Sequence, residues 1–195
     1  MAFEMRAVTV RFTSRRGSEL FFGKPVTTKK DSKQTHEQYD EATWREKISR
    51  DSDGNVYWPH FAIKNALEES GKFLSMKIPG EGKKTFTDRF RKGVLVVQPM
   101  YLKLPNGEQV RLEHIKPKTL FVPADGKRGS GKRVMRIFPY LEQWLGEATI
   151  FIADPKISNE VLLEHLECVG QFIGFGSMRI GNGGVNGMST VELVA

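Results

Sequence analysis

The chain has 195 residues, of which 39% are hydrophobic and 27% charged, a composition that excludes an intrinsically disordered protein. Its 30 lysines and arginines outnumber its 23 aspartates and glutamates, giving a formal net charge of +7, and no apolar run is long enough to cross a membrane. The length fits one domain, which we expect to cover residues 1–195, and we expect no membrane partner. The single cysteine, Cys168, excludes an internal disulfide, so we expect the protein in the reducing cytoplasm.

The N-terminal half predicts one strand and two main helices. Residues 6–12 alternate between apolar and polar side chains and are rich in β-branched residues, which predicts a half-buried strand. The polar stretch over 13–34 predicts a long loop, and a short helix is expected over 36–49. Apolar residues at helical spacing predict a helix over 60–74, and a further basic helical turn follows at 85–92.

The C-terminal half predicts a series of strands, one helix and a closing strand. Pro99 lacks a backbone N–H, so the first of these strands lies at an edge or contains a bulge. Ser158 caps the helix over 159–173, and the basic, glycine-containing stretch over 124–132 predicts an exposed loop. The predicted strands cover residues 94–104, 109–115, 119–122, 133–140, 144–153 and 188–194.

The order of these elements predicts an α+β fold. Without insertions it is β-α-β-β-α-β, the ferredoxin-like arrangement. We expect an antiparallel sheet with helices on one face, and insertions at about 13–54 and 105–132, the second forming a thumb-like β-hairpin. The other face of such a sheet is open, and RNA-recognition domains use it to bind their partner.

The positive charge is concentrated in two windows. Residues 72–92 carry a net charge of +5 and residues 114–136 a net charge of +6. Segregated cations are what binding to a polyanion requires, if the fold brings both windows to one groove; a solvated basic face without a partner is the alternative. The candidate nucleic-acid ligands are Lys83, Lys84, Arg89, Arg91, Lys127, Arg128, Lys132 and Arg133, with Tyr101 and Tyr140 as rings for base stacking.

A glycine-rich loop precedes the closing strand. Glycine lets another backbone approach closely, so the loop predicts a site where a partner lies against main-chain N–H groups, with a plain flexible connector as the alternative. Arg179 inside it is the expected phosphate ligand. The spacing fits neither a dinucleotide fingerprint nor a P-loop, and no cofactor is expected. The glycines of this loop are Gly174, Gly176, Gly181, Gly183, Gly184 and Gly187.

Two segments resemble motifs of the CRISPR-associated RAMP superfamily. Val56–Leu67 is similar to the motif that opens the first helix of that fold, and Gly174–Gly187 to its glycine-rich loop. With the leading strand, the resemblance covers about three regions and is closest to short stand-alone phage-encoded relatives. It implies single-stranded nucleic acid on a basic, glycine-edged surface, commonly with subunits side by side. Val185–Met188 departs from the basic and aromatic pattern usual there, and His60-Phe61 replaces small hydroxyl residues.

The sequence contains no catalytic constellation. The four histidines fall in four separate predicted elements without metal-ligand spacing, so no metal and no catalytic residue are expected. Some RAMP relatives cleave RNA without metal by using a histidine as general base, and His36 or His60 are the candidates for that role. The hypothesis is therefore sequence-tolerant binding of single-stranded DNA or RNA by a self-associating protein. The alternatives are a metal-independent RNA-processing endonuclease and a phage protein that engages a host defence complex.

Overall fold

The computed structural model describes residues 4–124, 129 and 131–194. The helices are α1 (His36–Thr43), α2 (His60–Leu74), α3 (Thr87–Gly93) and α4 (Asn159–Cys168), with short 3-10 or π turns at Trp44–Lys47, Leu112–His114, Val169–Ile173 and Ile180–Asn182. The strands are β1 (Arg6–Ser14), β2 (Leu20–Phe21), β3 (Tyr57–Trp58), β4 (Val94–Leu95), β5 (Met100–Lys103), β6 (Lys116–Pro123), β7 (Arg133–Leu141), β8 (Leu145–Ile152) and β9 (Ser189–Val194).

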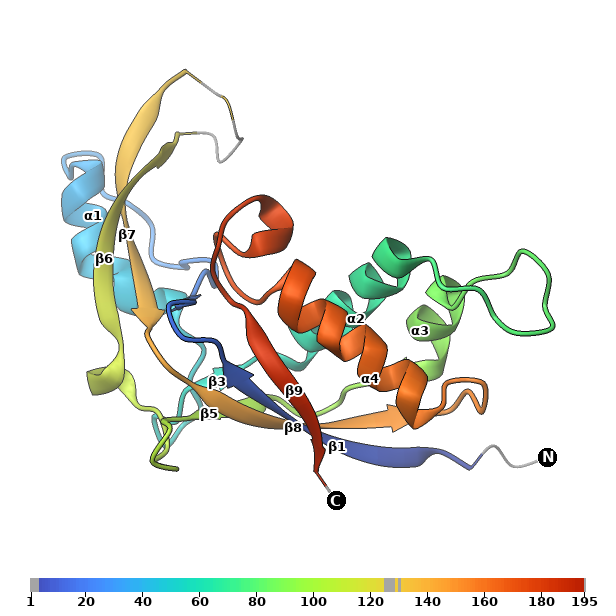
Figure 1. Cartoon of the computed structure of the whole chain (residues 1–195). Coiled ribbons are helices and arrows are strands. Elements are labelled where there is room, and N and C mark those ends of the chain that lie inside the picture. The colour runs from blue at the N-terminus through green and yellow to red at the C-terminus, as the bar shows by residue number, and fades with distance from the viewer. Residues whose placement is uncertain (1–3, 125–128, 130, 195) are drawn as a thin grey trace.

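The main sheet confirms the ferredoxin-like prediction. Its order is β3-β5-β8-β1-β9, with β4 also paired to β8, and neighbouring strands are antiparallel. The chain passes from β1 through α2 to β5, and β8 lies between these two strands in the sheet. It passes from β8 through α4 to β9, and β1 lies between these two strands. This is the split β-α-β arrangement. Both connecting helices cover the same face of the sheet (Figure 1).

The core lies between this helical layer and the sheet. β1 points Val10 and Phe12 into it, both fully buried, as the alternation of the strand predicts. α2 contributes Ile63 and Leu67, one turn apart and fully buried. The helix predicted over 159–173 begins at its Ser158 cap but changes from α to π geometry after Cys168.

The strand predicted over 94–104 is broken in two, and Pro99 lies in the break. Leu95 pairs with Phe151 and Leu102 with Gly146, so seven steps along the β4–β5 segment face five steps along β8. The two extra residues form the irregular stretch around the proline, which cannot donate a ladder hydrogen bond. The sequence prediction of a bulge or edge position is correct, whereas the prediction of one continuous strand is wrong.

A second, three-stranded sheet has the order β2-β7-β6 and forms the thumb, which rises from the main sheet (Figure 1). β2 lies within the segment predicted as a loop over 13–34 and pairs with the end of β7. The strand predicted over 109–115 does not form. After a single bridge at Gln109, the backbone N–H of Arg111 donates to His114 Nδ1 at 3.0 Å and closes a helical turn. The thumb strand then starts at Lys116, earlier than predicted.

The thumb is fastened to α1 by a buried carboxylate. Asp40 is 2% exposed and accepts hydrogen bonds from Arg136 Nη1 and from the Ile137 backbone N–H, each at 3.1 Å. Lys47 Nζ lies 3.7 Å from the same carboxylate and donates to the Ile137 carbonyl at 2.6 Å. These contacts join the helical segment 36–47 to the middle of β7, so the thumb is anchored there.

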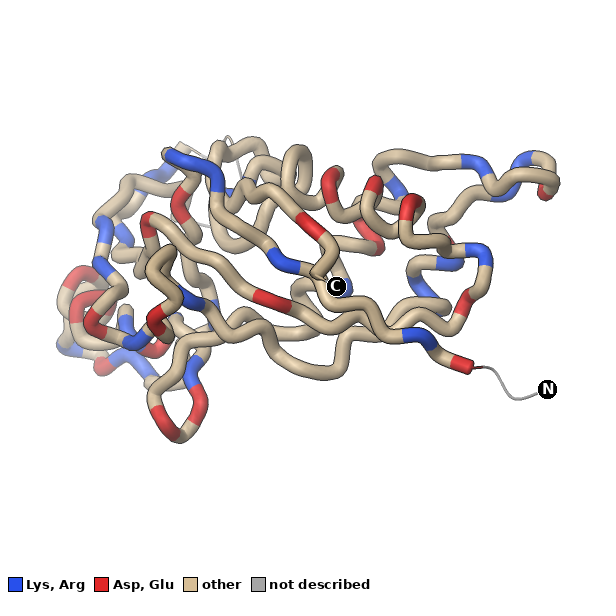
Figure 2. Tube along the Cα trace, turned by 60° about the horizontal axis from the view of Figure 1, so that its bottom comes forward, with Lys and Arg blue, Asp and Glu red and all other residues tan. Residues whose placement is uncertain are grey.

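The open face of the main sheet has a different character from the expected binding platform. Arg11 on β1 lies between Glu147 on β8, at 2.6 Å, and Glu192 on β9, at 3.0 Å. Figure 2 brings this face forward. Two carboxylates against one guanidinium give this cluster a net negative charge, which disfavours a polyanion there. The expectation that a nucleic-acid partner lies on the open face is therefore not supported.

Candidate nucleic-acid interface

The two basic windows lie at opposite ends of the molecule. The loop between α2 and α3, which carries Lys83 and Lys84, projects from one end, and the thumb hairpin rises from the other (Figure 1). The view turned by 60° shows the same separation (Figure 2). The expectation that both windows line one groove is wrong, because the whole length of the main sheet separates them.

Within the first window, the arginines have partners of their own. Arg89 donates to Glu81 at 2.7 and 3.0 Å and to Asp154 at 2.7 Å, so its guanidinium joins two segments of the chain. Arg91 is 3.6 Å from Asp88 on the same helix. Lys84 extends into solvent, 3.7 Å from Glu81. Arg89 is thus a structural residue in this fold.

The second window lies on the thumb. Lys132 and Arg133 are exposed, and Arg133 donates to the Phe121 carbonyl across the hairpin at 3.1 Å. Lys127 and Arg128 lie outside the described residues. Tyr140 stacks on Phe21, with ring centroids 5.6 Å apart, and so helps to close the thumb sheet.

Tyr101 lies on β5, in the main sheet. Its ring meets the edge of its cross-strand neighbour Tyr57, with centroids 6.0 Å apart, and it is 39% exposed. Partial burial, followed by the negative charge of Asp51, raises the pKa of its hydroxyl. The ring therefore keeps an exposed face but is not part of either basic window.

The glycine-rich loop pairs most of its own main-chain N–H groups. Phe175 N–H donates to the Gly187 carbonyl at 2.9 Å and Ser177 N–H to the Phe21 carbonyl at 2.9 Å. Gly187 has φ 73°, and a Cβ there would lie 1.9 Å from the Phe175 carbonyl oxygen. The glycines thus allow a close approach, as predicted, but the approaching backbone belongs to the loop itself and to β2.

Arg179, the expected phosphate ligand, is bound to a carboxylate. Its Nη2 donates to Glu69 on α2 at 2.8 Å, its Nη1 donates to the Ile173 carbonyl at 3.3 Å, and its side chain is 21% exposed. This ion pair ties the glycine-rich loop to α2. It also places a guanidinium at the wall of the cavity described next.

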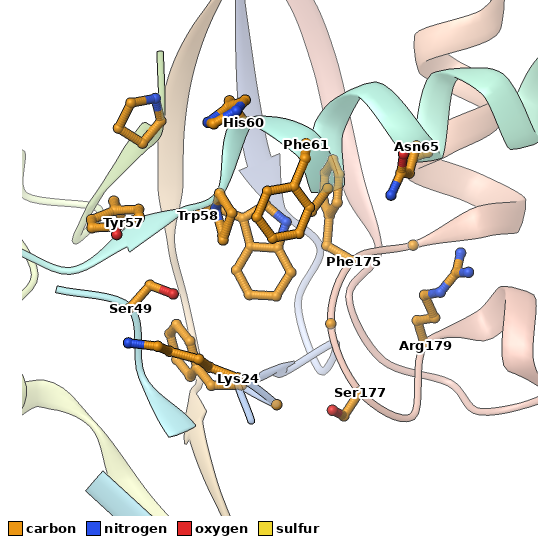
Figure 3. A pocket seen from close by; sticks show the side chains of 18 of the residues that line it. Lys24, Ser49, Tyr57, Trp58, His60, Phe61, Asn65, Phe175, Ser177 and Arg179 are labelled. Atoms are coloured by element: carbon orange, nitrogen blue, oxygen red, sulfur yellow. The ribbon is translucent and has the colours of Figure 1, made fainter. Parts of the chain in front are cut away.

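A cavity of about 800 Å³ opens beside the base of the thumb, between the start of α2, the glycine-rich loop and the segment after β2 (Figure 3). Its lining includes the aromatic side chains of Phe22, Trp58, Phe61 and Phe175. The rings of Phe22 and Phe175 lie 5.9 and 6.2 Å from that of Trp58 and hold it in place, whereas Phe61 is 57% exposed.

The charge lining this cavity is positive. Lys24, Lys47 and Arg179 border it, but Arg179 is paired with Glu69 and Lys47 with Asp40, so the positive excess comes from Lys24. Lys24 is exposed, whereas burial lowers the pKa of Lys47, with Asp40 acting in the opposite direction. α2 starts at this cavity without a side-chain cap, because Pro59 precedes it. Free N–H groups at a helix start favour an anion.

The two candidate histidines and the single cysteine occupy different parts of the fold. No group of three His, Cys, Asp or Glu side chains could hold a metal ion in the part of the chain that the structure describes. His60 borders the cavity and is exposed, with the Phe61 ring edge-on at 5.8 Å, whereas His36 starts α1. Cys168 is buried, which raises the pKa of its thiol to about 11. None of the described helices is both long and apolar enough to span a membrane.

Sequence reasoning missed Lys24 and Asn65 as cavity residues. Lys24 lies outside both basic windows, in a stretch that the sequence predicts only as polar loop. Asn65 is one turn after Phe61 on the exposed side of α2, so its position follows from helical spacing once the cavity is known. The RAMP-like motif at Val56–Leu67 was the usable signal, because it contains the lining residues Trp58 and Phe61.

No family model and no curated protein matches the sequence. Among solved structures, the chain is similar to the one described as the Type III-B Cmr-beta bound to cognate target RNA, with a TM-score of 0.55 and 16% identity. The match covers 98% of this chain, which spans only 60% of the length of that neighbour. Cmr6 from Pyrococcus furiosus matches over 100% of both chains at 13% identity, with a TM-score of 0.47. The similarity to the Cmr-beta structure shows that the chain shares its fold.

Proposed function

We propose that this chain binds single-stranded nucleic acid at the cavity beside the thumb, with little sequence preference along most of the strand and with copies placed side by side. The observation that carries the proposal is the cavity itself, which combines the exposed ring of Phe61 with the exposed cation of Lys24. Single strands are bound by such a combination, since cations neutralise phosphates and rings stack on bases. The RAMP-like fold supports the same function, because the Cmr-beta neighbour is solved bound to target RNA.

Binding is tested by fluorescence anisotropy with labelled oligo-U and oligo-dT of equal length over a salt series. We expect the affinity to fall with salt, with a logarithmic slope of about −0.7 for each neutralised phosphate. Lys24→Glu should weaken binding to both, because this exposed cation borders the cavity. A flat salt response would remove the proposal.

Side-by-side assembly is tested by light scattering on nuclease-treated protein mixed with oligonucleotides of increasing length. The mass of the complex should rise in steps of one 22.1 kDa chain as the oligonucleotide lengthens. A complex that stays at one chain per oligonucleotide at every length would contradict the assembly and leave binding intact.

We propose binding without cleavage. His60 is the one histidine that borders the cavity, and no hydrogen bond orients its imidazole within the described part of the chain, as a general base requires. Incubation of end-labelled RNA, with and without EDTA, should leave it intact. Cleavage that resists EDTA and is lost in His60→Ala would instead support the endonuclease.

A further inference from the structure

One face of α2 presents three different side chains to the cavity at intervals of four residues. Phe61, Asn65 and Glu69 lie one above another along the helix and all border the cavity. Glu69 is held by Arg179 at 2.8 Å, whereas the ring of Phe61 and the amide of Asn65 are exposed. Figure 3 shows the Asn65 side chain next along the helix from Phe61, on the side of the cavity where Arg179 lies. An exposed ring with an exposed amide one turn away matches a flat ligand that has a hydrogen-bonding edge.

We propose that this cavity is a subsite for one unstacked adenine of the bound strand. Its ring stacks on Phe61, and the Asn65 amide pairs with N6 and N7. Asparagine pairs in this bidentate way with adenine, and unstacked bases of single strands are read along such edges. The inference rests on the proposed function and adds one selective position to otherwise sequence-tolerant binding.

Size and charge agree with a neutral, flat ligand. About 800 Å³ lies within the range of 300–1,000 Å³ that is typical of small-ligand cavities. Arg179 neutralises the carboxylate of Glu69, so no unpaired negative charge faces the base. Lys24, on the opposite wall, is left for a flanking phosphate.

The test compares oligo-U with the same oligonucleotide carrying one central adenosine. We expect the adenosine to tighten binding about 5- to 100-fold, the discrimination typical of a good bidentate pair. Asn65→Leu, a change on the exposed side of α2, should abolish this preference, so that the two oligonucleotides bind the variant with equal affinity. Central cytidine and guanosine serve as further arms, and a preference for either over adenosine would overturn the assignment.

Stacking is tested separately. Phe61→Ala should weaken binding of every oligonucleotide about 5- to 100-fold, as for the loss of one base–aromatic stack, and Phe61→Tyr should restore it. Phe73→Ala is the matched control, because Phe73 is also an exposed phenylalanine of α2, at 59%, but stacks on Phe172 away from the cavity. Salt-dependent oligo-U binding without adenosine preference would overturn the subsite alone. Absence of binding to any oligonucleotide would overturn the proposed function with it.

Discussion

His165 is fully buried in α4, where its ring stacks on Phe90 with centroids 4.0 Å apart. Its Nδ1 lies 2.7 Å from the Val161 carbonyl and therefore carries the proton, which leaves Nε2 as an acceptor without a partner in the described part of the chain. Burial lowers the pKa of His165, so the folded protein holds this imidazole neutral. Protonation at Nε2 would place an unpaired charge among apolar side chains.

This burial predicts that acid destabilises the protein. Below the ordinary histidine pKa of about 6.5 the unfolded chain binds a proton at this residue that the folded chain does not, so the free energy of unfolding decreases as the pH falls. The limiting slope is about 1.4 kcal/mol per pH unit for one proton. Urea unfolding between about pH 5 and 7 should show a smaller slope in His165→Phe than in the wild type. His36→Gln, at an exposed position, should keep the wild-type slope. Equal slopes in His165→Phe and the wild type would contradict the prediction.

A substitution at Gly187 tests whether the glycine-rich loop needs a residue without a Cβ for its close backbone packing. Gly187→Ala places a Cβ 1.9 Å from the Phe175 carbonyl oxygen at a φ of 73°, so both clash and strain act against folding. Gly107→Ala is the control, because its φ of 88° gives similar strain but no atom lies within 4 Å of the added Cβ. Strain alone costs about 1–2 kcal/mol, and Gly187→Ala should lose clearly more than Gly107→Ala in chemical unfolding. Similar losses would show that the loop can move aside.

The residue types predicted which side chains carry charge and where the backbone is free to adopt unusual conformations. They did not predict which groups these residues contact in the folded chain. Arg89 and Arg179 fit a phosphate equally well by type, yet each is engaged by carboxylates from distant segments, Asp154 and Glu69. The glycine positions were correctly predicted to allow close approach, since that depends on the residue itself. What approaches them depends on the folded chain.

At the scale of the elements, the thumb depends on the buried carboxylate of Asp40. Asp40→Ala removes the acceptor of Arg136 and of the Ile137 N–H and leaves the partly buried Lys47 without its counter-charge. Breaking a buried pair costs about 3–5 kcal/mol. Relative to the wild type, we expect the rate of amide hydrogen exchange in Asp40→Ala to increase more in β6 and β7 than in β1 and β8. Glu142→Ala, which removes an exposed partner of Lys116 at 2.9 Å, should change stability by about 1 kcal/mol or less and leave thumb exchange unaltered. Exchange that rises equally in both sheets would contradict a local role.

Elements whose own residues decide their structure were predicted well. The alternation over 6–12 and the apolar stripe over 60–74 each specify an element with a buried face. β2 was missed because it has only two residues and its partner, β7, lies about 120 positions later in the chain. The strand expected over 109–115 failed because a local backbone-to-side-chain hydrogen bond at His114 competes with the ladder.

At the scale of the whole molecule, the sequence shows that the positive charge is segregated but not where it lies in space. Lys83 and Lys84 of the first window lie in a loop that projects from one end of the molecule, and most of the second window lies in the thumb at the other end (Figures 1 and 2). The cavity instead draws Lys24 from a segment outside both windows and Arg179 from the glycine-rich loop. Counting charges along the chain therefore identified the class of partner we propose, while the proposed site required the fold.

This separation predicts that reversing the charge of Lys24 weakens nucleic-acid binding, whereas reversing the charge of Lys83 does not. Lys24 and Lys83 are both exposed, but only Lys24 borders the cavity. At about 0.15 M salt, exposed charges further apart than about 8 Å are largely screened from each other, so Lys83→Glu should leave affinity for the shortest bound oligonucleotide unchanged. Lys24→Glu should weaken it and make the salt slope shallower by the loss of about one phosphate contact. If Lys83→Glu weakened binding as much as Lys24→Glu on the same oligonucleotide, the strand would have to reach the far end of the molecule, and the cavity would not be the binding site.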